Sequence, residues 1–202
     1  MMIESAAKTG TRWRIIMLAL ACAAAGVTAS VLFLPRQSLW NDEATQLVGI
    51  TLDPWSQVRW LADYENHDFG VPDDRMPPLS YWIDWGWSRL FGMSEPAMRS
   101  VGVVAVGLAT LLVFGAGRRA WGTPAGVAAA LLLALSPGVV VTSVEIRAYP
   151  LFLATSAGLF YCLIRLLDED ESRPTSWLAA MTLFAVAGCY THFFGVVAAG
   201  GA

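Results

Sequence analysis

Residues 15–34 read Ile-Ile-Met-Leu-Ala-Leu-Ala-Cys-Ala-Ala-Ala-Gly-Val-Thr-Ala-Ser-Val-Leu-Phe-Leu, and this uncharged stretch of 20 residues decides the class of fold. As an α-helix it would cover about 30 Å, the thickness of the hydrocarbon core of a bilayer. Lys8, Arg12 and Arg14 precede it, and because cytoplasmic flanks are rich in basic residues, we expect its N-terminal end to be cytoplasmic. The small residues at 21–25 also fit a cleaved signal peptide, but the apolar run continues well past them, which favours a retained helix.

The composition of the whole chain also indicates a membrane protein. Hydrophobic residues make up 56% of the 202 residues and charged residues only 14%, whereas soluble domains carry roughly 25% charged residues. A chain of this length cannot bury so much apolar surface in one small core, which excludes a soluble globule, a disordered tail and a secreted disulfide scaffold. The net charge of −3 offers no basic surface to nucleic acid. The three cysteines stand singly in apolar segments, without the spacing of a metal site.

Further apolar segments predict an all-α polytopic membrane protein with five transmembrane helices and the start of a sixth. After the first span, the expected spans are residues 101–117, 123–144, 149–167 and 177–190, and a further span that begins at 193–202 and continues in a longer protein. Ser136-Pro137 lies inside the third span and predicts a kink there. Alternation from a cytoplasmic N-terminus (1–14) places the loop at 168–176 inside and the long loop at 35–100 outside.

The outer loop at residues 35–100 is rich in both charged and aromatic residues. It holds ten of the 16 acidic residues and six of the nine tryptophans. Apolar residues alternate with charges in 54–64 and 79–91, which predicts amphipathic helices along the membrane surface. Trp and Tyr favour that depth, so we expect an ordered interfacial layer in contact with lipid.

The sequence Trp40-Asn41-Asp42-Glu43 follows the first span closely. One interpretation is a helix N-terminus, with Asn41 or Asp42 as the cap and the acids complementing the helix dipole. The other is a carboxylate held at the membrane surface as a general base. Because neighbouring helical residues point in different directions, we expect one acid to do the chemistry and the other to bind substrate, metal or backbone.

Two more polar motifs stand at outer ends of the expected spans. Glu145-Ile146-Arg147-Ala148-Tyr149 lies between the third and fourth spans, and the planar fork of an arginine suits a phosphate group. The alternatives are an ion pair between Glu145 and Arg147, or an arginine that extends to lipid head groups. His192 follows the fifth span and is either a hydrogen-bonded structural residue or a ligand. Pro77-Pro78 is typical of a helix start.

Taken in order, these motifs resemble the N-terminal part of the C-superfamily glycosyltransferases. The resemblance is to the family 39-like, protein O-mannosyltransferase and aminoarabinose-transferase type, including bacterial core-sugar transferases, and it covers the chain from Leu39 to Gly195. The motifs are Trp-Asn-Asp-Glu-Ala (40–44), Pro-Pro-Leu-Ser-Tyr-Trp (77–82), Arg-Leu-Phe-Gly (89–92), Glu-Pro-Ala-Met-Arg (95–99), Ser-Pro (136–137), Glu-Ile-Arg-Ala-Tyr (145–149) and Tyr-Thr-His-Phe-Phe-Gly (190–195).

The resemblance implies an enzyme of the bacterial-type plasma (inner) membrane that takes a sugar from a polyprenyl-phosphate carrier on the outer face. It transfers the sugar, with inversion, to a hydroxyl of a lipid, glycan or protein. The resemblance implies that Asp42 is the catalytic base with Glu43 beside it, and that Pro77 and Pro78 shape the site.

Such a transfer also needs positive charge at the leaving phosphate. We expect that charge from Arg147, with His192 or a divalent metal ion as further candidates, and we expect Glu145 and Tyr149 to bind substrate beside it. Many relatives carry a histidine directly before the proline pair, where this chain has Met76, although His67 is nearby in sequence.

Two other classes of protein stay open on the sequence. A transporter or flippase would place its working charges near the membrane midplane and usually carries internal repeats, whereas here the charges stand at the outer ends and no repeat is visible. In a membrane scaffold without activity, the same residues would be helix caps and charges that extend to the lipid surface.

Overall fold

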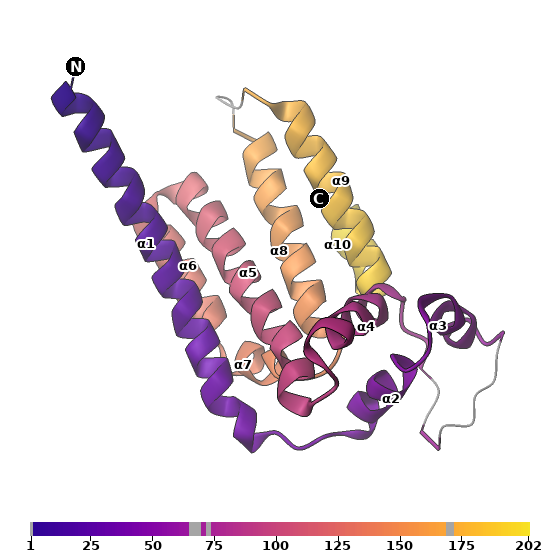
Figure 1. Ribbon diagram of the computed structural model, residues 1–202. Coiled ribbons are helices and arrows are strands. Elements are labelled where there is room, and N and C mark those ends of the chain that lie inside the picture. Colours follow the sequence, from indigo (N-terminus) through magenta and orange to yellow (C-terminus); the bar gives the residue numbers. More distant parts are fainter. Residues whose placement is uncertain (1, 65–69, 72–73, 169–171) are drawn as a thin grey trace.

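The computed structural model describes residues 2–64, 70–71, 74–168 and 172–202, and these residues form helices and turns with no strand (Figure 1). The elements are α1 (Met2–Phe33), the 3-10 turn η1 (Leu34–Arg36), α2 (Asn41–Gly49), α3 (Pro54–Leu61), α4 (Leu79–Phe91), α5 (Glu95–Trp121), α6 (Thr123–Ala134), α7 (Pro137–Ser143), α8 (Tyr149–Leu166), α9 (Pro174–Thr191) and α10 (Phe194–Gly200). The expected all-α class is confirmed for this part of the chain.

Three of these helical segments are long and apolar enough to cross a bilayer. They are Thr11–Arg36, Glu95–Trp121 and Tyr149–Leu166, and the pair α6 and α7 passes the same test together. The described residues therefore hold three spans, or four if the bent pair is one span. The expected five spans are not confirmed, because α9, although 18 residues long, is not apolar enough to qualify as a span.

The predicted kink in the third apolar segment is confirmed. α6 and α7 meet at an angle of 60°, and α7 begins at Pro137 with Ser136 as its N-cap in an extended conformation. A proline has no backbone N–H to continue the preceding helix and restricts the residue before it to extended backbone. The second segment instead belongs to a longer helix, since α5 begins at Glu95 rather than near residue 101.

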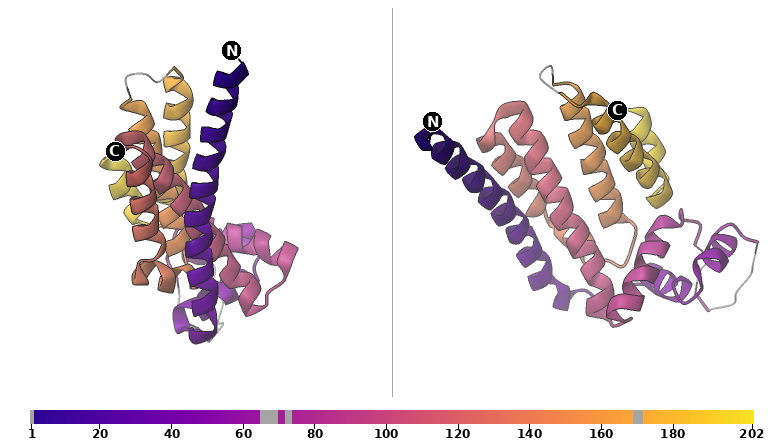
Figure 2. Two further views of the ribbon diagram at one scale, coloured as in Figure 1. Left: turned by 90° about the vertical axis from the view of Figure 1, so that its left-hand side faces the viewer. Right: turned by 45° about the horizontal axis from the view of Figure 1, so that its top comes forward.

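The long helices lie side by side, and the short helices α2, α3 and α4 gather at one end of them (Figures 1 and 2). The start of α1, the α5–α6 connection, the end of α8 and the start of α9 lie at the other end. There Arg119 forms an ion pair with Asp168. The chain direction therefore brings the residues that follow α1, α7 and α9 to the same end of the molecule.

The short helices form an ordered layer with its own hydrophobic core. The buried residues of this core come from the C-cap of α2, from α3, α4 and α5, and from the α7–α8 connection: Ile50, Trp60, Leu61, Tyr81, Met98 and Ile146. Of the predicted helices over 54–64 and 79–91, the second is confirmed by α4 and the first is shorter than expected, because α3 ends at Leu61. Asp53 begins α3 by accepting hydrogen bonds from the N–H groups of Trp55 and Ser56.

Small residues allow the helices behind this layer to approach closely. A side chain at Gly102 of α5 would collide with the carbonyl oxygen of Ser143 at the end of α7. The Ser143 hydroxyl in turn donates a hydrogen bond of 2.7 Å to Ser30 of α1. These contacts fix the position of the α7–α8 connection.

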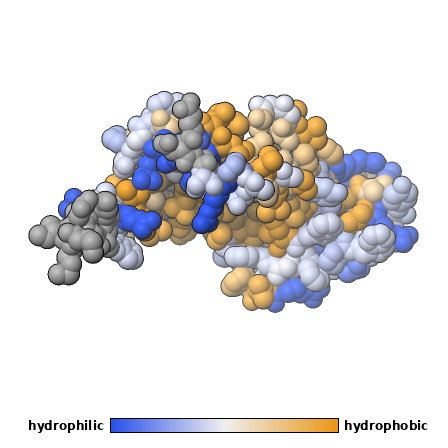
Figure 3. Space-filling view, turned by 90° about the horizontal axis from the view of Figure 1, so that it is seen from above, coloured by the Kyte–Doolittle hydropathy of each residue, from blue (hydrophilic) through white to orange (hydrophobic). Residues whose placement is uncertain are grey.

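The outward faces of the long helices are apolar. Seen from above, hydrophobic residues cover much of the middle of the molecule, with hydrophilic ones toward its two sides (Figure 3). Large side chains such as Leu32 of α1, Val104 of α5, Leu132 of α6 and Leu183 of α9 are more than half exposed. Exposed apolar surface of this extent is typical of a surface that faces lipid.

Candidate active site

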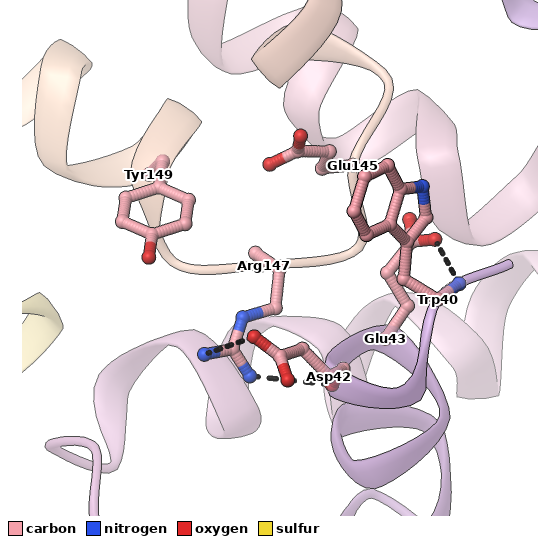
Figure 4. Close-up of a pocket in the computed structure, with 6 residues that line it drawn as sticks. All are labelled: Trp40, Asp42, Glu43, Glu145, Arg147 and Tyr149. Carbon is pink, nitrogen blue, oxygen red and sulfur yellow. Dashed lines mark hydrogen bonds and ion pairs between the residues drawn. The ribbon is translucent and has the colours of Figure 1, made fainter. Parts of the chain in front are cut away.

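A cavity of about 190 Å³ lies between the start of α2 and the α7–α8 connection (Figure 4). It is lined by Trp40, Asp42, Glu43, Glu145, Arg147 and Tyr149. The structure thus brings together two motifs that are about one hundred residues apart in the sequence, and five of the six lining residues are candidate site residues from the sequence.

Glu43 lines the cavity but is almost fully buried, and both of its carboxylate oxygens accept hydrogen bonds. Its side chain is 2% exposed, and Oε1 accepts hydrogen bonds of 2.9 Å from Arg99 Nη1 and from the N–H of Ile146. Its Oε2 accepts a hydrogen bond of 3.0 Å from the N–H of Trp40. Glu43 therefore ties α2, α5 and the α7–α8 connection together.

Arg99 completes this buried network. Its side chain is fully buried, and besides Glu43 it donates to the carbonyl oxygen of Val144 and, from Nε, to Glu95 Oε1 at 2.9 Å. Removing one partner of such a buried pair leaves an uncompensated charge in a poorly solvated interior. The Glu43–Arg99 pair thus stabilises the positions of both cavity motifs, because it contacts the backbone at Trp40, Val144 and Ile146.

The helix cap at the first motif lies one residue earlier than expected. Trp40 is the N-cap of α2, and Asn41 and Asp42 are its first two residues. The expected cap at Asn41 or Asp42 is wrong because the carboxylate of Glu43, three residues after Trp40, satisfies the N–H of Trp40. Asp42 is left with its side chain 73% exposed at the cavity.

Arg147 lies beside Asp42 at the cavity and is largely buried. Its side chain is 11% exposed, and Nη2 lies 3.8 Å from Asp42 Oδ2. Nη1 donates to the backbone carbonyl of Asp42 at 3.2 Å and to Asp74 Oδ2 at 3.2 Å. Among the residues that the structure describes, Asp42 and Asp74 are thus the carboxylates that form ion pairs with Arg147.

Glu145 lines the same cavity from the α7–α8 connection. Partial burial and, after it, the negative charge of Glu43 raise the pKa of Glu145 above its ordinary value. Glu145 therefore holds a proton at a higher pH than a carboxyl group in water. The cavity therefore contains the exposed side chain of Asp42 and a second carboxyl group, Glu145, whose pKa is raised above its ordinary value.

His192 lies next to the cavity, in an aromatic cluster. Its ring centroid is 5.5 Å from that of Tyr149, 5.3 Å from that of Phe152 and 5.1 Å from that of Phe194. His192 Nδ1 accepts a hydrogen bond of 3.2 Å from the N–H of Phe194. Burial and then the charge of Arg147 lower its pKa. His192 contacts the cavity residue Tyr149 but is not among the six residues that line the cavity.

Pro77 and Pro78 lie outside the cavity lining and directly before α4. Pro78 is the N-cap of α4, in agreement with the interpretation of the pair as a helix start. Met76 packs against the hydrophobic core of the layer formed by the short helices. His67 lies outside the described residues.

Sequence reasoning missed three residues that support the site. Asp74 contacts Arg147, Tyr81 contacts Asp74, and Arg99 holds Glu43. Tyr81 and Arg99 stand inside motifs quoted for the resemblance, whereas Asp74 lies three residues before Pro77 and carries no pattern of its own. Among the residues that the structure describes, no group of three or more His, Cys, Asp or Glu side chains is placed to hold a metal ion.

The family of the chain follows from comparison with known proteins. Residues 75–200 match the family model of dolichyl-phosphate-mannose-protein mannosyltransferases. This chain belongs to that family. It is therefore a membrane glycosyltransferase of the C-superfamily type. The match includes the motifs at Pro77-Pro78, 145–149 and His192, whereas Asp42 and Glu43 precede it. Searches of curated proteins and of solved structures found no match.

Proposed function

We propose that the enzyme moves a sugar from a polyprenyl-phosphate carrier to a hydroxyl group of a lipid, glycan or protein, with inversion at the anomeric carbon. The observation that carries the proposal is the cavity in which the exposed carboxylate of Asp42 faces the guanidinium of Arg147, at the end of the apolar helices. A base and a phosphate-binding group at one end of the spans suit a donor whose tail stays in lipid.

In the proposed reaction, Asp42 accepts the proton of the acceptor hydroxyl as its oxygen bonds to the anomeric carbon. The bond between that carbon and the carrier phosphate breaks, and its electron pair leaves with the phosphate. Arg147 binds the phosphate oxygens and stabilises the charge that develops on them. Glu145 and Tyr149 contact the substrate in the remaining space, while Glu43 positions Asp42 and Arg147 through the Trp40 and Ile146 backbone.

We also propose that this end of the molecule faces the outside of a bacterial-type plasma membrane. The opposite end of the molecule includes the last turn of α5, which carries Arg118 and Arg119, and basic residues mark cytoplasmic flanks. In this arrangement α9 is a fifth span beside α8, and the short helices α2 to α4 lie along the outer surface.

The proposal is tested with the full-length enzyme in detergent or in lipid nanodiscs. The assay compares sugar transfer to cell-envelope extracts from a polyprenyl-phosphate sugar and from a nucleotide sugar. We expect transfer from the lipid-linked donor alone. For Arg147→Ala we expect a KM for this donor about 10- to 100-fold higher, because a charge-assisted hydrogen bond is lost. Transfer from the nucleotide sugar alone, or an unchanged donor KM in the variant, would contradict the proposal.

A further inference from the structure

Asp74 is a largely buried carboxylate beside Arg147, and it does not line the cavity. It lies in the segment that leads to α4, and its side chain is 11% exposed. Its Oδ2 accepts hydrogen bonds from Tyr81 Oη at 2.6 Å and from Arg147 Nη1 at 3.2 Å. Asp74 therefore connects Tyr81, in the core of the short-helix layer, to Arg147, the proposed phosphate-binding arginine.

Tyr81 provides a rigid support for this carboxylate. Its side chain is fully buried in the core of the short-helix layer, and its ring meets that of Trp60 edge to face at 5.8 Å. Burial and then the charge of Asp74 raise the pKa of Tyr81, so its hydroxyl stays protonated and donates to Asp74. The position of Asp74 is thus set by the packing of α4, independently of any substrate.

The two terminal nitrogens of the Arg147 guanidinium, Nη1 and Nη2, have different contacts. Nη1 has two hydrogens, and they point to Asp74 Oδ2 and to the backbone carbonyl of Asp42. Nη2 lies 3.8 Å from Asp42 Oδ2, which is too long for a hydrogen bond. Figure 4 shows the guanidinium beside Asp42. Nη2 can therefore donate to an oxyanion while Nη1 remains held.

We propose that Asp74 is a positioning residue for the donor site: it holds Arg147 by Nη1 so that Nη2 is presented to the phosphate of the donor. The inference rests on the proposed function, because it takes the phosphate of a polyprenyl carrier as the group that Arg147 binds. Without Asp74, the guanidinium loses its anchored partner and can turn toward the nearby carboxylate of Asp42. Donor binding then requires Arg147 to be reordered, which lowers affinity for the phosphate.

The experiment measures binding of polyprenyl phosphate to the full chain in detergent micelles, with the phosphate-free polyprenol as the reference ligand. We expect Asp74→Ala to raise the Kd for polyprenyl phosphate about tenfold, the equivalent of one charge-assisted hydrogen bond. Asp74→Asn keeps an oxygen that can accept from both Tyr81 and Arg147, and should recover part of this loss. The matched control is Asp63→Ala, which removes an exposed carboxylate paired with Arg75 at 3.0 Å and should leave the Kd unchanged.

Transfer kinetics supply a second readout that a merely structural role would not produce. We expect Asp74→Ala to raise the donor KM about tenfold while kcat stays within about threefold. If Asp74→Ala does not fold, Asp74→Asn and Tyr81→Phe carry the same test. Wild-type affinity in folded Asp74 variants, or a loss confined to kcat, would overturn the role of Asp74. A wild-type enzyme that does not bind polyprenyl phosphate would instead overturn the proposed function, and this inference with it.

Discussion

Replacement of Arg99 by methionine should destabilise the enzyme strongly. Methionine has a comparable length but no charge, so Glu43, with its side chain 2% exposed, would keep a buried carboxylate without its cation. Breaking a buried ion pair by removing one partner costs about 3–5 kcal/mol. For a protein of this size each kcal/mol lowers the melting temperature by about 2–4 °C, so we expect a decrease of roughly 6–20 °C.

The assay is thermal unfolding in detergent of four proteins: wild type, Arg99→Met, Glu43→Gln and the double variant. The double variant removes both charges, and replacement of a whole buried pair by uncharged side chains is often nearly neutral. We therefore expect the double variant to be more stable than Arg99→Met alone. A melting temperature of Arg99→Met within 2 °C of wild type, or a double variant with the full sum of both losses, would refute the role of this pair as the anchor of the site.

Two further predictions concern the surroundings of the site. Burial raises the pKa of Asp84 to about 7, so between about pH 4 and pH 7 the folded state keeps a proton that the unfolded state has released, and stability decreases as the pH rises. Asp84→Asn should weaken the decrease in melting temperature between pH 5 and pH 8. The same decrease in the variant and in the wild type would contradict the raised pKa of Asp84. Gly102→Ala should destabilise by about 1–3 kcal/mol, because its Cβ collides with the Ser143 carbonyl. The matched Gly107→Ala, whose Cβ would meet only Val27 at 3.4 Å, should change the melting temperature less, and equal effects would refute the steric argument.

The class of fold was predictable because it depends on local properties of the chain. An uncharged run of 20 residues fits a bilayer whatever surrounds it, and Pro137 interrupts a helix by its own geometry. The number of spans was harder to predict, because a helix such as α9 has the length of a span but is not apolar enough to qualify as one.

The site was only partly predictable because its residues meet through packing. The motifs at Asp42 and Arg147 could be placed at the same end of the molecule by counting spans, and the structure brings them to one cavity. Which of the two adjacent acids is buried could not be predicted, since burial of Glu43 depends on Arg99, 56 residues away in the sequence. Asp74 reaches Arg147 over 73 residues, and no periodicity or spacing signals such a contact.

The most direct test of the proposed mechanism is the rate of sugar transfer by Asp42→Asn in the full-length enzyme, with a polyprenyl-phosphate sugar as donor. Asparagine keeps the size of the side chain at an exposed position and removes its ability to accept a proton. We predict that kcat decreases about 10²- to 10⁴-fold while the melting temperature stays close to that of wild type. A folded Asp42→Asn enzyme that transfers sugar at the wild-type rate would contradict the assignment of Asp42 as the base.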